Sequence, residues 1–405
     1  MGTGSLQPGR AVRLLYVDNA IRTFVSHRLW LAREALRQGF SVHVAVPDGD
    51  SSSELVSAVE REGIVIHGYH LRRRGVNPLS EARSLASLLN LYRAVKPDLI
   101  HNVRIKPVIY GGLAARAAGI HRVVGTITGL GYSFHGESLL QKVLQRVIET
   151  GLRYAVGRNG QRTVFQNEDD LERLLSKHVL DAEACSVVEG SGVDVNEFSP
   201  QPELPAEAPL VVLPSRMLWD KGVEEFVAAA TTLRAESVPG RFALVGDSDD
   251  GNPFSIPAAQ LRAWAERGAV EWWGWRSDMP DILRRAHIVC LPTYGEGCPR
   301  VLLESAAAGK PIVTTDVPGC RSIVQDGVNG FLVQVRNVAA LVAALRTLLL
   351  NESLRSRMGE NSRKLALTRF SNEIVAQQMF SLYYALLNQA VPDWNPVDRE
   401  SYTAT

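Results

Sequence analysis

The chain has 405 residues and a formal net charge of +1, and 45% of its residues are hydrophobic. A single hydrophobic core seldom extends over so long a chain, so two domains are expected. The near-neutral charge excludes a dedicated nucleic-acid-binding protein, and the composition excludes a disordered or fibrous one.

Short apolar runs alternate with helical patterns through the first half of the chain. Strands are expected at 12–18, 41–47, 64–69, 99–102 and 122–128, and helices at 26–38, 52–62, 78–95 and 107–118. Strands that alternate with helices through short connections predict right-handed βαβ units and a parallel sheet. We therefore predict a Rossmann-like domain over residues 1–198.

The same alternation restarts after a proline-rich, acidic segment at 199–209, which we interpret as a linker. Strand-like runs follow at 210–213, 242–245, 270–273, 288–291 and 312–314. A second Rossmann-like domain is expected at 210–371, and the remainder, 372–405, is predicted to form a helix that crosses back to the first domain. This α/β fold, with two doubly wound sheets, places a ligand in the cleft between the domains, at the carboxyl ends of the strands.

The segment 294–309, YGEGCPRVLLESAAAG, carries the strongest functional signal. Its glycines allow a tight loop after a strand, and Pro299 stands where a helix is expected to begin. The free N–H groups at that helix start suit a diphosphate, with Glu296 just outside and Glu304 about 7–8 Å along the axis. A nucleotide sugar has a diol on either side of its diphosphate. Glu304 is therefore predicted to hold the ribose and Glu296 the sugar; the alternative is one capping and one solvated glutamate.

A second segment, LPSRMLWDKG at 213–222, directly follows the first strand of the second domain. Arg216 and Lys221, on a loop between strand and helix, can both point at a phosphate at the sheet edge. Cleavage of a sugar–diphosphate bond places negative charge on the leaving group, and fixed cations stabilise that transition state. The alternative is that both side chains are merely solvated.

Both segments resemble motifs of glycosyltransferase family 4. Three shorter motifs share this resemblance: LVGD at 244–247, TDVPG at 315–319 and DGVNG at 326–330. The resemblance implies retaining enzymes of the GT-B fold, in which two Rossmann-like domains face each other across a cleft. The first-half motifs KPDLIH, KPVIYG, VGTITGLGY and Gln166-Asn167 are similar to those of bacterial transferases that extend undecaprenyl-diphosphate-linked saccharides, N-acetylgalactosaminyltransferases among them.

The resemblance implies transfer of an N-acetylhexosamine such as GalNAc from a UDP-sugar to an undecaprenyl-diphosphate-linked saccharide, in the assembly of bacterial surface polysaccharide. It implies no metal ion and no other cofactor. No second carboxylate or Ser-His pair is evident as a nucleophile beside the expected sugar site, so we expect same-face displacement, with a donor phosphate oxygen taking the acceptor proton. Three alternatives stay open: a GDP- or ADP-sugar donor, a UDP-N-acetylhexosamine 2-epimerase-like enzyme, and a non-catalytic nucleotide-sugar-binding protein.

By the same resemblance, Arg216, Lys221 and Glu296 are the expected catalytic residues, and Glu304 contacts the donor ribose. The other expected donor-binding residues lie around the nucleobase, the sugar and the helix start: Gly246, Asp247, Trp275, Arg276, Gly297, Cys298, Pro299 and Arg300.

The acceptor is expected to contact a set of residues in the first domain: Arg22, His27, Arg74, Lys106 and Thr128. Two departures from the family bear on this set. The loop at 18–23 lacks the two glycines of many members, and Thr128 stands where many members have His. No catalytic His is therefore assigned.

An amphipathic helix is predicted at 138–156, with apolar pairs along one side and Lys142, Arg146 and Arg153 on another. It can pack on its own domain or lie on an anionic membrane beside the lipid-linked acceptor. Between Arg61 and Phe165 the sequence has sixteen Lys and Arg and five acidic residues, which suits an anionic substrate or membrane surface.

The four scattered cysteines favour neither a disulfide framework nor a zinc site. The polar N-terminus has no signal-peptide pattern, and no apolar run reaches the length of about 18 residues that a spanning helix needs. We expect a cytoplasmic protein that can touch the inner face of the cytoplasmic membrane.

Overall fold

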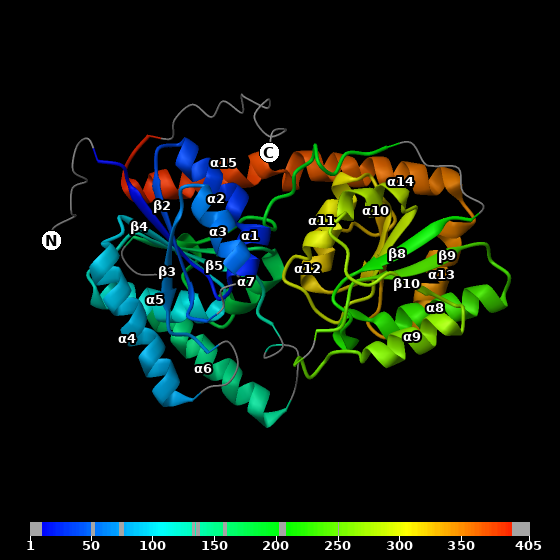
Figure 1. Ribbon diagram of the computed structural model, residues 1–405, viewed down its shortest axis with the longest axis horizontal. Coiled ribbons are helices and arrows are strands. Elements are labelled where there is room, and N and C mark those ends of the chain that lie inside the picture. Colours follow the sequence, from blue (N-terminus) through cyan, green and yellow to red (C-terminus); the bar gives the residue numbers. More distant parts are fainter. Residues whose placement is uncertain are drawn as a thin grey trace.

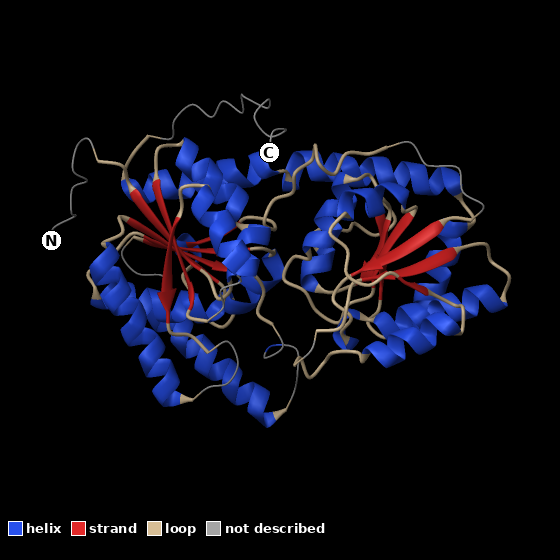
Figure 2. Cartoon of the chain, viewed as in Figure 1, coloured by secondary structure: helices blue, strands red, loops and turns tan. Residues whose placement is uncertain are grey.

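The computed structural model describes residues 10–49, 53–72, 77–131, 134, 138–156, 160–201, 208–249 and 251–390. These residues form two α/β domains side by side, each with a parallel sheet between two layers of helices (Figures 1 and 2). The predicted fold class, two Rossmann-like doubly wound domains, is confirmed.

The first sheet has seven strands in the order β3-β2-β1-β4-β5-β6-β7. Its strands are β1 (Arg13–Val17), β2 (Ser41–Pro47), β3 (Val65–Tyr69), β4 (Leu99–Val103), β5 (Val123–Ile127), β6 (Gln161–Phe165) and β7 (Cys185–Val187). Its helices are α1 (Ile21–His27), α2 (Leu29–Arg37), α3 (Ser53–Arg61), α4 (Pro78–Val95), α5 (Ile105–Ala117), α6 (Leu139–Ala155) and α7 (Glu168–Leu175). Every residue of β4 and β5 is buried, as expected for central strands that helices cover on both faces.

The second sheet has six strands in the order β10-β9-β8-β11-β12-β13. Its strands are β8 (Leu210–Pro214), β9 (Arg241–Val245), β10 (Glu271–Trp272), β11 (Ile288–Leu291), β12 (Ile312–Thr315) and β13 (Gly330–Val333). Its helices are α8 (Val223–Ala235), α9 (Ala258–Glu266), α10 (Met279–Arg285), α11 (Arg300–Ala307), α12 (Pro318–Arg321), α13 (Val338–Leu349) and α14 (Glu352–Leu365). The order of β8, β11 and β12 aligns the loops that follow these strands along one edge.

The last helix, α15 (Asn372–Leu387), packs on the first domain, although α14 before it belongs to the second (Figure 1). Its Phe380 and Tyr383 lie in the same core as Tyr16 of β1. Tyr383 Oη lies 2.6 Å from His101 Nδ1, and His101 Nε2 lies 2.7 Å from Thr126 Oγ1. Full burial holds the pKa of His101 well below its ordinary value, so the ring is neutral and ties α15 to β4 and β5.

Some elements differ from the sequence-based expectation. The helix expected at 26–38 is two helices, α1 and α2, that meet at Arg28, where φ is −131°. The break turns the Arg28 side chain into the domain, where it is only 4% exposed. The strand expected at 270–273 is shortened to β10, and three further strands, β6, β7 and β13, extend the sheets.

Candidate functional site

The two domains meet through the loops that follow their strands. In the second domain these loops follow β11 and β12, and in the first they follow β5 and β6. Asn167, directly after β6, donates from Nδ2 a 2.8 Å hydrogen bond to the carbonyl oxygen of Gly297. The predicted donor-binding loop around Gly297 therefore lies against the first domain.

Lys221 and Glu296 form an ion pair between the loops that follow β8 and β11. Gly222 has a left-handed φ of 70°, and a Cβ added there would overlap the carbonyl oxygen of Pro292, so the two loops touch backbone to backbone. The side chains of Lys221 and Glu296 are 13% and 21% exposed, which shields the pair from solvent. Two of the three predicted catalytic residues are thus in contact.

Arg216, the third of them, lies on the same loop as Lys221 but has another partner. Its Nη1 donates a 2.8 Å hydrogen bond to Asp249 Oδ2, and its side chain is 62% exposed. An exposed ion pair contributes at most about 1 kcal/mol. An anion at the strand ends can therefore draw Arg216 away from Asp249 with little loss of stability.

The residues predicted to surround the nucleobase lie at the ends of β9 and β10. Gly246 has φ of 142°, and a Cβ there would overlap a carbonyl oxygen of the loop after β8. Asp247 is exposed. Trp275 is 67% exposed, and Arg276 donates hydrogen bonds of 2.8 and 2.5 Å to the carboxylate of Asp278. The exposed Trp275 indole offers a flat surface on which a base can stack.

Glu304 lies one turn inside α11, and Arg300 is the first residue of that helix. The Arg300 Nε donates a 2.7 Å hydrogen bond to Glu304 Oε1. Glu304 is 8% exposed; burial raises its pKa, the Arg300 charge opposes that shift, and the nearby Glu197 adds to it. Ordinary solvation of Glu304, the alternative left open by the sequence, is excluded.

The loop 296–299 leads directly into α11. Pro299 is extended, with φ of −71° and ψ of 116°, and it precedes the free N–H groups of the helix start. The Glu296 carbonyl accepts a 3.2 Å hydrogen bond from the Gly319 N–H. Burial raises the pKa of the Cys298 thiol, so the thiol stays protonated. The Glu296 carbonyl oxygen is thus held by α12, and the Cys298 side chain of this loop is neutral.

The residues predicted for the acceptor are not all in one place. The Thr128 carbonyl lies against Gly297, and the His27 ring is near enough to Arg300 of the other domain for that charge to lower its pKa. Arg22 is exposed. Lys106 Nζ donates a 3.0 Å hydrogen bond to Glu81 Oε1 of α4. Arg74 lies outside the described residues.

Burial, with the charges of Arg28, Arg300 and Arg104 as further causes, lowers the pKa of His27 to about 3. The ring is therefore neutral near pH 7 and cannot donate a proton as an imidazolium. Ser26 Oγ lies 2.6 Å from its Nδ1, which fixes the orientation of the ring.

Three further charged residues lie near this face: Asp18 and Arg28, which were not predicted to belong to the site, and Arg104, which the basic segment offers beside Lys106 as a contact for lipid head groups or the acceptor diphosphate. Asp18 follows β1 and is 1% exposed, and Arg104 Nε lies 3.8 Å from its Oδ1. Burial raises the pKa of Asp18, and the Arg104 charge opposes that shift. Arg28 is the third, and burial lowers the pKa of its guanidinium. Asp18 and Arg104 share one sequence signal, their position: each comes directly after a buried strand.

Helix α6 has one buried face and one apolar face toward solvent. Leu152 and Ala155 pack in a core with Val108 and Ile109 of α5. The exposed apolar side chains are Leu139, Leu140, Val143, Val147 and Tyr154, with exposed fractions of 80, 77, 50, 59 and 56%. Packing on its own domain therefore accounts for only one side of α6.

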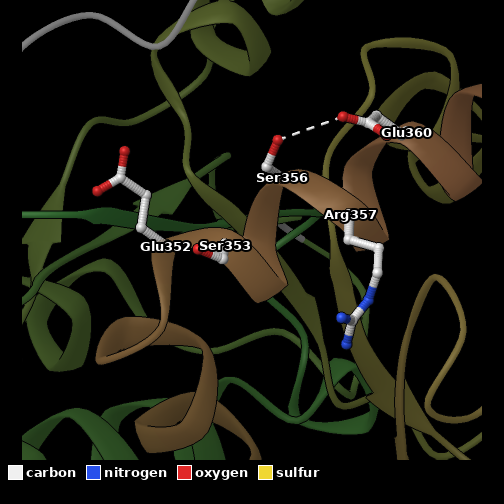
Figure 3. Close-up of a pocket in the computed structure, with 5 residues that line it drawn as sticks. All are labelled: Glu352, Ser353, Ser356, Arg357 and Glu360. Carbon is white, nitrogen blue, oxygen red and sulfur yellow. Dashed lines mark hydrogen bonds between the residues drawn. The ribbon is translucent and has the colours of Figure 1, made fainter.

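A separate depression of about 390 Å³ lies on α14, and its side chains are drawn in Figure 3. It is lined by Glu352, Ser353, Ser356, Arg357 and Glu360. All five residues are exposed, and Ser356 Oγ donates a 3.4 Å hydrogen bond to Glu360 Oε1. This open face contains none of the predicted site residues.

Within the described ranges no helix is long and apolar enough to cross a bilayer. The same residues contain no group of three or more His, Cys, Asp or Glu side chains arranged to hold a metal ion.

Two Rossmann-like domains that meet through their strand-end loops define the GT-B class of transferases. A family model for glycosyl transferases group 1 matches residues 194–365, and one for glycosyl transferase 4-like proteins matches residues 13–156. The chain belongs to this glycosyltransferase family, family 4, as its motifs predict.

Two curated relatives match long stretches of the chain. The N,N'-diacetylbacillosaminyl-diphospho-undecaprenol alpha-1,3-N-acetylgalactosaminyltransferase of Campylobacter jejuni is 27% identical over 384 residues, 92% of this chain and 98% of the relative. The UDP-Gal:alpha-D-GlcNAc-diphosphoundecaprenol alpha-1,3-galactosyltransferase of Escherichia coli is 26% identical over 287 residues, 67% of this chain and 71% of the relative.

Among solved structures, Anabaena Alr3699/HepE in complex with UDP and glucose superposes with a TM-score of 0.73 at 19% identity. The match covers 91% of this chain and 98% of the other. A sucrose-phosphate synthase from Thermosynechococcus elongatus gives a TM-score of 0.76 at 18% identity, with coverage of 93% and 99%. Both likenesses support the GT-B fold.

Proposed function

We propose that this glycosyltransferase transfers an N-acetylhexosamine, with GalNAc the best candidate, from a UDP-sugar to an undecaprenyl-diphosphate-linked saccharide in bacterial glycan assembly. The observation that carries the proposal is the Lys221–Glu296 ion pair beside the start of α11, with Glu304 buried one turn further on. The similarity to the Campylobacter jejuni N-acetylgalactosaminyltransferase, over nearly the whole of both chains, supports the choice of donor and acceptor.

In this proposal the donor lies along the loop 296–299. Lys221 and Arg216 bind the diphosphate together with the free N–H groups of α11, while Glu304 holds the ribose diol and Glu296 a sugar hydroxyl. The uracil stacks near Trp275. Two cationic side chains and a helix start supply the positive charge that the diphosphate needs, so the proposed reaction uses no metal ion.

The proposed reaction retains the configuration at the sugar C1. The bond between C1 and the diphosphate oxygen breaks, and its electron pair leaves with UDP. The acceptor oxygen bonds to C1 from the same face, and its proton passes to a donor phosphate oxygen. Lys221 and Arg216 accelerate the step because they contact charge that is larger in the transition state than in the substrate.

The exposed face of α6 suits the membrane in which a lipid-linked acceptor resides. At about 100° per residue, its five exposed apolar side chains fall within an arc of about 100°, opposite the buried face. Lys142, Arg146 and Arg153 are exposed and lie along one edge of that arc. An apolar arc with cations at its edge binds an anionic lipid surface, because the side chains enter the interface while the cations contact head groups.

A transfer assay tests the proposed function. The chain is incubated with UDP-GalNAc and a short-chain polyprenyl-diphosphate disaccharide, and the extended lipid is detected by mass spectrometry. Parallel thermal-shift measurements with UDP, GDP and ADP identify the nucleotide. Stabilisation by GDP or ADP but not by UDP contradicts the donor assignment, and UDP binding without transfer to any lipid-diphosphate saccharide contradicts the acceptor assignment.

A further inference from the structure

The side chain of Asn167 is fixed by three hydrogen bonds. Its Oδ1 accepts from the Asp170 N–H at 2.8 Å, which caps the start of α7. Its Nδ2 donates to Asp170 Oδ2 at 3.0 Å and to the Gly297 carbonyl oxygen at 2.8 Å. Asn167 is 1% exposed, so no solvent competes for these bonds. A flipped amide would place its oxygen against the Gly297 oxygen, so the cap dictates that Nδ2 faces the other domain.

Gly297 is wedged between the domains. A Cβ on Gly297 would overlap the Thr128 carbonyl oxygen, and one on Gly129, whose φ is 138°, would lie 2.8 Å from the Gly297 Cα. A Cβ on Gly319 would overlap the Gly297 carbonyl oxygen. Glycines therefore let three backbone segments approach one another. A displacement of the first domain would change the backbone contacts of Gly297 directly.

The two fixed carbonyls set the directions of two N–H groups. In a trans peptide the N–H points away from the preceding carbonyl. Gly319 holds the Glu296 carbonyl and Asn167 holds the Gly297 carbonyl, so the N–H groups of Gly297 and Cys298 are held on the opposite side. Among the described residues neither N–H has a hydrogen-bond partner. Both can donate to an anionic ligand at the start of α11.

We propose that Asn167 is a positioning residue for the donor: from the first domain, it orients the Gly297–Cys298 peptide so that the Cys298 N–H faces the donor diphosphate. This inference rests on the proposed donor site and adds a residue of the acceptor-side domain to it. Donor affinity then depends on contact between the domains, because the group that orients the peptide is not part of the nucleotide-binding domain.

Asn167→Ser separates this role from that of the helix cap. Serine still caps α7 but is too short to reach Gly297. Titration calorimetry with UDP should show a Kd about tenfold higher, as expected for loss of one oriented hydrogen bond. The melting temperature of the chain without UDP should be nearly unchanged. Hydrogen exchange of the peptide that contains residues 293–299 should become faster, which the loss of a cap alone does not predict.

The matched control is Asp169→Ala, two residues along the same segment. It removes the 2.8 Å ion pair between Asp169 and Arg321, which also joins the domains but does not touch the loop 296–299. Its UDP affinity should stay within twofold of wild type. If Asn167→Ser is too unstable to assay, Asn167→Thr decides by the same criteria, since its hydroxyl can also cap α7 and is too short to reach Gly297.

The outcomes separate the two proposals. A wild-type chain that binds no UDP overturns the proposed function itself. A wild-type chain that binds UDP, with the Asn167 variant binding it within twofold, overturns the positioning role and leaves the donor site standing. Equal weakening by the Asp169 variant assigns the effect to domain contact in general and also overturns the role of Asn167.

Discussion

Lys221 and Glu296, which are 75 residues apart in the sequence, form an ion pair across the loops that follow β8 and β11. The contact keeps the cation and the acidic residue of the site together at the edge of the second sheet. In the proposed complex, the donor diphosphate and Glu296 both contact the Lys221 ammonium group, so one carboxylate oxygen of Glu296 can bind a sugar hydroxyl.

Lys221→Ala should lower kcat/KM on the order of 10² to 10³-fold, because a preorganised donor to the leaving group is worth about 3–4 kcal/mol. Steady-state transfer rates measure the effect. The matched control is Lys177→Ala, which breaks the surface ion pair with Glu149 and should leave the rate within twofold. A Lys221→Ala rate within tenfold of wild type contradicts the role of Lys221.

Glu304→Gln should weaken UDP binding about tenfold, because a charged hydrogen bond to the ribose is replaced by a neutral one. The change should also reduce, by about the same factor, the discrimination between UDP and 2′,3′-dideoxy-UDP, which the wild-type chain is expected to bind more weakly than UDP. Calorimetric titration of both nucleotides into both chains measures this. Undiminished discrimination in the variant shows that Glu304 does not hold the ribose.

His27 should make the chain less stable as the pH falls below about 6.5. Its pKa is about 3 in the folded chain, so between these values the unfolded chain binds the proton and the folded chain does not. The free energy of unfolding is therefore unaffected by protonation of His27 above about pH 6.5, and at pH 5 it is about 2 kcal/mol lower because of this residue. His27→Gln should reduce the difference between the unfolding free energies at pH 7.5 and 5 by this amount, measured by urea titration. An unchanged difference contradicts a buried, neutral His27.

Leu140→Glu should weaken binding to vesicles of anionic phospholipid about tenfold, because it replaces an inserted apolar side chain with a charge that the surface repels. Cosedimentation at low salt measures the bound fraction. Leu350→Glu is the matched control, since Leu350 is 62% exposed on the second domain, and it should have no effect. A wild-type chain that does not sediment with the vesicles removes the membrane role of α6.

The sequence predicts the alternation of strands and helices well because buried parallel strands are short apolar runs. It does not predict the break at Arg28, where periodicity continues from α1 into α2 while the backbone turns. The strand expected at 270–273 is also one residue too long at each end, because the apolar Val270 and Trp273 flank the two residues that pair with β9.

The candidate site could be predicted where one local segment carries the chemistry, as for Glu296 and Glu304 around the start of α11. Contacts between residues that are far apart in the sequence could not be predicted. The pairing of Arg216 with Asp249 and the hydrogen bond from Asn167 to Gly297 depend on how the loops are packed and how the domains meet. In the sequence, Asn167 stands out only as part of the Gln166-Asn167 motif, which supports the family resemblance but indicates no partner in the other domain.

The central claim is that Lys221, Arg216 and the start of α11 converge on the donor diphosphate, and a crystal structure with bound UDP tests it most directly. The account predicts phosphate oxygens within hydrogen-bond distance of Lys221 Nζ and of the first N–H groups of α11, with both ribose hydroxyls on Glu304 and Arg216 turned from Asp249 to the phosphate. UDP bound elsewhere, with Lys221 paired only with Glu296 and Arg216 still on Asp249, would contradict it.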